Sequence, residues 1–172
     1  MNEMREIRSE PAPGNNDKAP KVTILYVDDD PTDRKLFELS LRKLDSDLYD
    51  LTCVATLDEV REFLSARSVD YFVSDNRLHP TTTFRDTLIG LEDCVIDGKI
   101  VVISSETDTV VTAEKSDLVH VPDMIRDKFA FFSDLRAIGL AALDGQQSEK
   151  NADKVWLSQS QPTAPAGDFH PV

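Results

Sequence analysis

Three consecutive aspartates, Asp28, Asp29 and Asp30, directly follow the apolar run ILYV at residues 24–27. At an effective dielectric constant near 20, two unscreened carboxylates a few ångströms apart repel each other by roughly 4 kcal/mol. A solvated turn after a buried strand would accommodate them, because Asp and Pro are ordinary turn formers. A cation site would also accommodate them, because clustered oxygen ligands suit Mg²⁺. The rest of the chain is needed to choose between these two interpretations.

Two more predicted strands end in side chains that could take part in the same chemistry. Asp75 ends the apolar run DYFVSD, and Ser104 and Ser105 end KIVVISS. A carboxylate can attack phosphorus and form an aspartyl-phosphate, provided that a divalent metal screens the two anions from each other. One or two of the first aspartates, together with Asp75, would hold Mg²⁺, and a serine hydroxyl would donate to a phosphoryl oxygen.

The elements that must position these residues alternate between strand-like and helix-like hydrophobic periods. Helices are predicted after Pro31, from a T-x-x-E capping box at Thr56, around 88–95 and from about 123 to 143, and any helix between 105 and 117 must be short or absent. Strands are predicted at 22–27, 51–55, 70–75, 99–105 and 117–121.

Near-continuous apolar strands separated by helices are typical of a parallel α/β sheet that is covered on both faces. Ligands bind such sheets outside the carboxyl ends of the strands. We therefore expect the three aspartates, Asp75 and the two serines to line one edge of the sheet. The flanking compositions predict disordered tails at 1–20 and 145–172 around a domain at 21–144.

Composition limits the classes of partner. The 172-residue chain carries 32 acidic and 19 basic side chains, for a formal net charge of −13. Without a basic cluster, we expect no binding to nucleic acid. The first 20 residues lack an apolar segment, and no run approaches a membrane span, so we expect a cytoplasmic protein with no membrane partner. Cys53 and Cys94 lie in apolar contexts without CxxC spacing, which favours buried, reduced thiols.

Taken together, VDDDP at 27–31, DYFVSD at 70–75 and VVISS at 101–105 resemble the receiver domain of two-component response regulators. The resemblance covers roughly residues 22–143. It implies a flavodoxin-like, doubly wound (βα)5 fold with strand order 2-1-3-4-5. It also implies that a histidine kinase or a phosphotransfer protein donates the phosphoryl group.

The same resemblance assigns roles to individual residues. Asp28 and Asp29 take the positions of the acidic pair that holds Mg²⁺, and Asp75 takes that of the phosphoacceptor and a metal ligand. The backbone carbonyl of Arg77 would be a further metal ligand. Ser104 takes the place of the hydroxyl that contacts the phosphoryl group.

The sequence departs from the family at the predicted fifth strand. Receivers usually carry Lys-Pro after this strand, whereas this chain has Val121-Pro122, and the nearest downstream lysine is Lys128 on the predicted last helix. Leu118 takes the position of the switch aromatic, three residues before the lysine. After Asp75, the expected proline is one residue late, and no glycine follows it before the next helix. We therefore expect altered switching and a reshaped active-site loop.

Three functions fit these observations. The first is a single-domain response regulator that is phosphorylated on Asp75 and signals through protein contacts. The second is a phosphorylation-independent pseudo-receiver adaptor, which the missing lysine motivates. The third is a haloacid-dehalogenase-like phosphatase, because Asp28 to Thr32 also fit a DxDxT motif with Asp28 as nucleophile and Asp30 as general acid. The KVWLSQ segment at 154–159 is either a docking motif or a segment that packs back onto the domain.

Overall fold

The computed structural model describes residues 20–79, 82–105 and 118–149. Within these ranges, five parallel strands form one sheet in the order β2-β1-β3-β4-β5, which confirms the predicted flavodoxin-like topology. The strands are β1 (Val22–Val27), β2 (Tyr49–Val54), β3 (Tyr71–Asp75), β4 (Lys99–Ser104) and β5 (Met124–Asp127).

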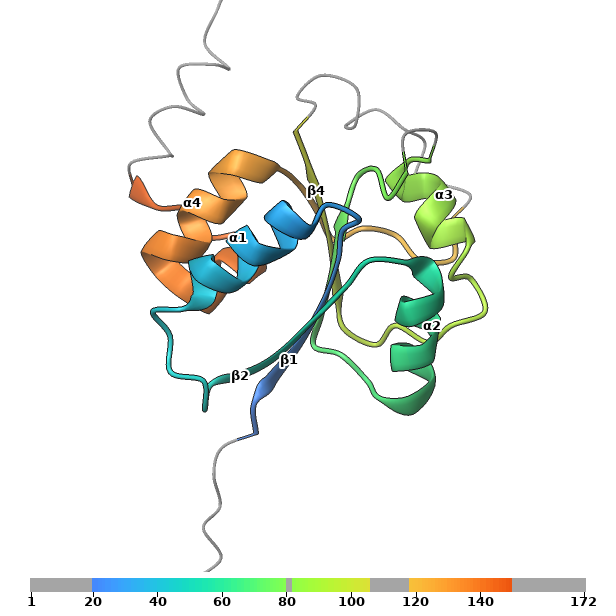
Figure 1. Cartoon of the computed structure of the whole chain (residues 1–172), viewed down its shortest axis with the longest axis horizontal. Coiled ribbons are helices and arrows are strands. Elements are labelled where there is room, and N and C mark those ends of the chain that lie inside the picture. Colours follow the sequence, from blue (N-terminus) through green and yellow to red (C-terminus); the bar gives the residue numbers. More distant parts are fainter. Residues whose placement is uncertain (1–19, 80–81, 106–117, 150–172) are drawn as a thin grey trace, which may run out of the picture.

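Helices cover both faces of the sheet. In Figure 1, α1 and α4 lie on one face, and α2 and α3 lie on the other. The predicted tails lie almost wholly outside the described residues, as do KVWLSQ and the segment predicted to hold a short fourth helix. The helices are α1 (Pro31–Leu41), α2 (Leu57–Ala66), α3 (Phe84–Ile89) and α4 (Lys128–Ile138), and the 3-10 helix η2 (Gly139–Asp144) follows α4.

Alternation along the strands divides the core between the two faces of the sheet. In β1, Tyr26 belongs to the cluster under α1 and α4, whereas Leu25 belongs to the cluster under α2 and α3. β3 and β4 alternate in the same way, because successive side chains of a strand point to opposite faces. Burial on both faces explains why these strands read as continuous apolar runs.

Local sequence signals set the starts of α1 and α2. Asp30 caps α1, and its carboxylate accepts a hydrogen bond from the Thr32 amide at 2.7 Å. The predicted capping box of α2 is confirmed, because the Thr56 hydroxyl accepts from the Glu59 amide while the Glu59 carboxylate accepts from the Thr56 amide. Because Asp30 is both the last of the three consecutive aspartates and the cap of α1, the helix starts immediately after them.

The fifth strand lies later than predicted. Residues 118–121 precede β5 instead of forming it, so the expected strand at 117–121 is wrong. The predicted last helix also begins too early, because Ile125 lies in β5 and α4 starts only at Lys128. Phe129, the second residue of α4, is 71% exposed. The strand consists of MIRD, whose two charged residues hide it from a search for apolar runs.

A buried ion pair neutralises Arg126, the positive charge of β5. The Arg126 guanidinium pairs with the Asp134 carboxylate of α4 at 2.5 Å, and the Asp134 side chain is fully buried. The other Asp134 oxygen accepts a hydrogen bond from the Ser148 amide at 3.0 Å. One carboxylate therefore joins the edge strand, the last helix and the segment that follows η2.

The third helix is shorter than its predicted apolar stripe. It ends at Ile89, and Leu91 is buried in the turns that follow, whereas Val95 is 68% exposed. Cys53 and Cys94 are both free, but each is only partly buried, against a different core cluster, so the expectation that they are buried is wrong. Burial raises the pKa of the Cys53 thiol to about 12. No helix in the described part of the chain is long and apolar enough to span a membrane.

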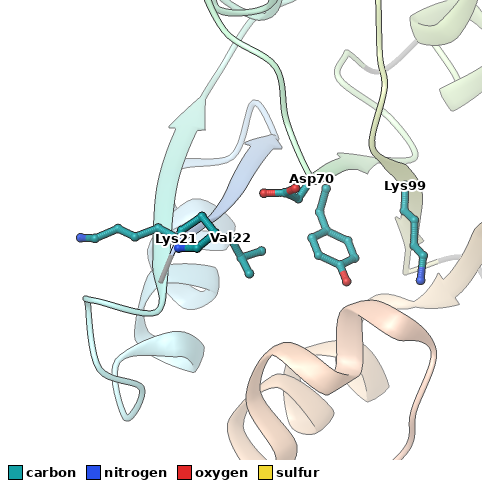
Figure 2. Close-up of a pocket in the computed structure, with 6 residues that line it drawn as sticks. Lys21, Val22, Asp70 and Lys99 are labelled. Carbon is teal, nitrogen blue, oxygen red and sulfur yellow. The ribbon is translucent and has the colours of Figure 1, made fainter. Parts of the chain in front are cut away.

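The opposite edge of the sheet, at the amino ends of the strands, carries an open hollow of about 400 Å³ (Figure 2). Its charged groups are engaged in local contacts. Lys21 donates to the Ser46 carbonyl at 2.9 Å, and Lys99 pairs with Asp144 at 2.5 Å. The Asp70 carboxylate accepts a hydrogen bond from the Thr23 amide at 2.7 Å. These contacts connect β1, β3 and β4 to neighbouring segments, and they give each of the three charged side chains a partner within the protein.

Candidate functional site

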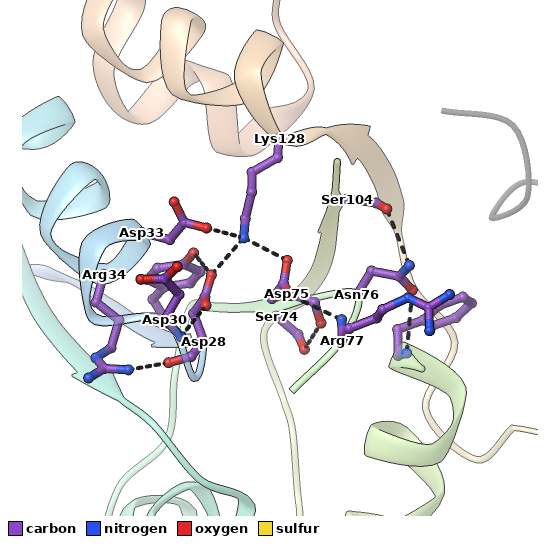
Figure 3. Close-up of polar contacts among 12 residues, drawn as sticks. Asp28, Asp30, Asp33, Arg34, Ser74, Asp75, Asn76, Arg77, Ser104 and Lys128 are labelled. Carbon is purple, nitrogen blue, oxygen red and sulfur yellow. Dashed lines mark hydrogen bonds and ion pairs between the residues drawn. The ribbon is translucent and has the colours of Figure 1, made fainter. Parts of the chain in front are cut away.

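The carboxyl edge of the sheet brings the predicted acidic residues together (Figure 3). Asp28 follows β1 and Asp75 ends β3, and one carboxylate oxygen from each of Asp28, Asp29 and Asp75 lies within 4.8 Å of the others. Ser104 lies at the end of β4 and is buried. Asp30 differs from its two neighbours, because its carboxylate caps α1.

A lysine that the sequence did not assign to the site lies at its centre. The ammonium group of Lys128 lies 2.9 Å from Asp28 and 2.8 Å from Asp75, and these three side chains are almost buried. It also lies 2.6 Å from Asp33, in the first turn of α1. Because Lys128 is the first residue of α4, directly after β5, the carboxyl ends of three strands converge on this cluster.

Opposing effects act on the charges of this cluster. Burial raises the pKa of the Asp75 carboxyl above its ordinary value, even though Lys128 and the Arg77 amide both favour the ionised form. Burial also works against the Lys128 ammonium, but hydrogen bonds to Asp33, Asp75 and Asp28 outweigh it and raise the pKa of Lys128. The lysine is therefore a fixed positive charge, and Asp75 is a carboxylate held at some cost.

Asp28 is held by several donors at once. One of its oxygens accepts from Lys128 and from the phenol of Tyr26, and the other accepts from the Asp30 amide at 2.9 Å. Burial, together with the charge of Asp28, raises the pKa of Tyr26, so the phenol remains a donor. The Tyr26 ring also stacks on Phe37 of α1, with 4.3 Å between the ring centroids. The orientation of Asp28 is thus set by the core as well as by the loop.

The loop after Asp75 connects the acidic edge to the serine at the end of β4. The Arg77 amide donates to the second oxygen of Asp75 at 3.0 Å. The buried Asn76 side chain donates to the Ser104 hydroxyl at 3.2 Å and accepts from the Phe84 amide, at the start of α3, at 3.5 Å. Asn76 therefore couples the residue after Asp75 to Ser104 and to α3.

Comparison with known proteins shows which proteins share this fold. Neither a protein-family model nor a curated protein sequence matches the chain. In contrast, the structure is similar to a CheY-like response regulator receiver domain from Methylobacillus flagellatus, with a TM-score of 0.54, 18% identity, and coverage of 72% of this chain and 99% of that one. It is also similar to a sensor protein from Polaromonas sp. JS666, with a TM-score of 0.56, 23% identity, and coverage of 73% and 98%.

A third similar structure is a response regulator from Burkholderia pseudomallei that contains a phosphorylated aspartic acid, a calcium ion and citrate. It matches with a TM-score of 0.55 and 19% identity, over 81% of this chain and 74% of that chain. The chain has the fold of a response regulator receiver domain. At these identities the similarity concerns the receiver fold, and the roles of individual residues depend on the geometry of this chain.

The receiver fold explains the position of Lys128. Receivers usually carry a lysine after the fifth strand, and aligning that strand at 117–121 left Val121 in this place. Because β5 ends at Asp127, Lys128 occupies the place, and the inference that this position lacks a lysine is wrong. The residue three positions before Lys128 is Ile125, so an aliphatic side chain replaces the switch aromatic here, as Leu118 did in the sequence alignment. The exposed Phe129 follows the lysine where proline is usual.

Four residues of the cluster were missed as functional candidates: Tyr26, Asp33, Asn76 and Lys128. Tyr26 is part of an apolar run, where an aromatic residue reads as core. Asp33 reads as an acid in the first turn of a helix, which the helix dipole favours on its own. Asn76 could have been found, because it directly follows Asp75 at the end of a buried strand. A polar side chain that is buried there is expected to have a hydrogen-bond partner within the site.

The donor set of the receiver site suits a divalent cation. Asp28, Asp29 and Asp75 offer hard carboxylate oxygens from two strand ends, and Asp29 is exposed, which leaves the group open to solvent on one side. These three carboxylates could therefore hold a divalent cation. The Arg77 carbonyl belongs to the same loop as Asp75, and its role as a further ligand stays a prediction.

Proposed function

We propose that this protein is a response regulator that accepts a phosphoryl group on Asp75. The observation that carries the proposal is the contact between Lys128 and Asp75 at 2.8 Å, next to two further carboxylates that can bind a cation. A phosphoacceptor needs a nucleophilic carboxylate, positive charge beside it, and access for the donor. Asp75 meets the first two needs, and the exposed Asp29 marks the side that opens to solvent.

Each residue has a defined part in the proposed chemistry. A carboxylate oxygen of Asp75 bonds to phosphorus while the bond between phosphorus and the donor breaks, and the donor leaves with that electron pair. Lys128 neutralises part of the charge on the transferred group, and the Ser104 hydroxyl contacts a phosphoryl oxygen. Mg²⁺ at Asp28, Asp29, Asp75 and the Arg77 carbonyl would screen the repulsion between the anions.

The donor we propose is a histidine kinase or a phosphotransfer protein, in the cytoplasm. The signal then passes through protein contacts of a single receiver domain, because a chain with a net charge of −13 is a poor ligand for nucleic acid. The protein would thus be a phosphoacceptor in a signalling pathway and not an enzyme with its own substrate.

The structure weakens the two alternatives. The pseudo-receiver hypothesis relied on a missing lysine, and Lys128 now fills that position. The phosphatase hypothesis needs Asp30 as a general acid, but its carboxylate accepts the capping hydrogen bond from Thr32. This contact, together with hydrogen bonds from the Thr32 side chain and the Asp33 amide, lowers the pKa of Asp30, which is the wrong direction for a group that must donate a proton near neutral pH.

The test is to incubate the purified chain with acetyl phosphate, with and without Mg²⁺, and to measure the intact mass. We expect one added phosphoryl group that depends on Mg²⁺ and is absent in Asp75→Asn. The matched control is Asp93→Asn, which makes the same substitution at an exposed aspartate in the turn after α3. The control should gain the phosphoryl group as the wild type does.

A phosphotransfer protein should replace acetyl phosphate as donor in a second reaction. No gain of mass with either donor would contradict the proposal and restore the adaptor. A gain that persists in Asp75→Asn would move the acceptor to another residue. Release of inorganic phosphate from a generic phosphate ester would instead support the phosphatase.

A further inference from the structure

Asp33 contributes a third carboxylate to the Lys128 ammonium. Their contact, at 2.6 Å, is the shortest of the three ion pairs that the lysine makes. An ammonium group has three N–H donors, and Asp28, Asp33 and Asp75 account for all of them. Figure 3 shows Lys128 reaching down from α4 to a position between these carboxylates.

The three partners of Lys128 differ in what else they can bind. Asp28 and Asp75 belong to the group whose oxygens could hold a cation, whereas Asp33 lies outside that group. Asp33 is also the most exposed of the three, with 25% of its side chain accessible, against 1% for Asp28 and 13% for Asp75. Lys128 thus shares two partners with a cation site and has one partner of its own.

This arrangement addresses a conflict within the site. A divalent cation on Asp28 and Asp75 would lie a few ångströms from the ammonium group, and like charges at that distance repel. The lysine must stay close, because its proposed part in the chemistry requires contact with the phosphoryl group. An anionic partner outside the cation site would hold the lysine there while its other two partners are engaged.

We propose that Asp33 is a positioning residue that holds Lys128 in the site when Asp28 and Asp75 bind a divalent cation. The inference rests on the proposed function and deepens it. Asp33 is suited to this part because the Asp30 cap and Pro31 fix the start of α1, so its carboxylate projects from a defined first turn. It contacts the substrate neither directly nor through the metal, and acts only through Lys128.

The first test is a double-mutant cycle without metal. The free energy of unfolding is measured for wild type, Asp33→Asn, Lys128→Met and the double variant in the presence of a chelator. We expect the two substitutions to be non-additive by about tenfold in the folding equilibrium constant, as is usual for contacting charges. Additivity would overturn the inference, because Asp33 would then not act through Lys128.

The second test measures the affinity for Mg²⁺ by calorimetry. Asp33→Asn should raise the dissociation constant about fivefold, because Lys128 then competes with the cation for Asp28 and Asp75. Asp33→Glu should restore affinity. Glu38→Gln removes the same charge from α1 at a residue that pairs only with exposed Lys35 among its described contacts, and should change affinity by less than about twofold.

Measurements in the Lys128→Met variant distinguish an effect of Asp33 on the position of Lys128 from a general effect of removing one negative charge. With Lys128→Met already present, Asp33→Asn should change the Mg²⁺ affinity by less than about twofold. Equal effects of Asp33→Asn in both backgrounds, or of Asp33→Asn and Glu38→Gln, would overturn the inference alone. A wild-type protein that does not bind Mg²⁺ would overturn both the inference and the proposed function.

Discussion

The ammonium nitrogen of Lys128 lies 2.9 Å from a carboxylate oxygen of Asp28, a residue 100 positions earlier in the chain. This contact joins the first strand to the last helix, and through Asp75 it includes the third strand. The lysine is therefore both a part of the proposed phosphoacceptor site and a link that holds the carboxyl edge of the sheet together.

Replacing Lys128 with Met should destabilise the metal-free protein by about 3–5 kcal/mol, because three carboxylates lose their shared buried cation. Added Mg²⁺ should recover more stability in this variant than in the wild type. Chemical denaturation with and without Mg²⁺ measures both effects. Lys35→Met, at an exposed pair on α1, should cost less than about 1 kcal/mol, and an equally small cost for Lys128→Met would argue against the cluster.

Asp75→Asn should raise the melting temperature in the presence of a chelator. Burial makes the ionised Asp75 costly, as its raised pKa indicates, and the amide oxygen of Asn can still accept from Lys128. A gain of about 1 kcal/mol corresponds to a few degrees for a domain of this size. Thermal unfolding by circular dichroism is the measurement, with Asp93→Asn as the control. An unchanged or lower value for Asp75→Asn would contradict the prediction.

Tyr26→Phe should destabilise the fold by about 1.5–3 kcal/mol, the usual range for a hydrogen bond to a charged group. The stacking on Phe37 is preserved, so the loss reports the phenol donor to Asp28. Tyr49→Phe is the matched control, because among the described residues its hydroxyl makes one long contact, 3.4 Å from the Leu41 carbonyl. Urea unfolding of the two variants should separate them, and equal losses would show that the Asp28 contact contributes nothing specific.

Glu59→Gln should lower stability at neutral pH and have a smaller effect in acid. The Ala55 amide, followed by the Thr56 hydroxyl, lowers the pKa of Glu59 below its ordinary value of 4.5. A carboxyl whose pKa is lowered by folding stabilises the protein above the unfolded pKa and loses that effect as the pH falls through the folded pKa. The melting temperature of wild type and variant, followed from neutral pH to about pH 3, should therefore converge in acid. Glu62→Gln, at an exposed position on α2, should show no such convergence.

The central part of the fold was predictable because both faces of the sheet are buried. Burial on both faces makes β1, β3 and β4 largely apolar, and a polar residue either ends each strand or directly follows it at the same edge. The rule that parallel strands share their carboxyl edge was enough to bring Asp28, Asp29 and Asp75 together. The capping box at Thr56 was predictable for a local reason, since its partners are three residues apart.

The position of β5 was not predictable in this way. As an edge strand it contains Arg126, which is tolerated because Asp134 neutralises it from the next helix. A pairing across two elements leaves no periodic signal, whereas the more apolar LVHV upstream resembles a strand without forming one. The error moved the strand end by several residues, which was enough to conceal Lys128.

The buried Asp134 has a practical consequence, because it connects the segment after η2 to the edge of the sheet that carries the proposed site. The Ser148 amide donates to the same carboxylate that pairs with Arg126, and Arg126 lies two residues before Lys128. Displacing this segment would therefore remove a hydrogen bond from the buried carboxylate that neutralises Arg126.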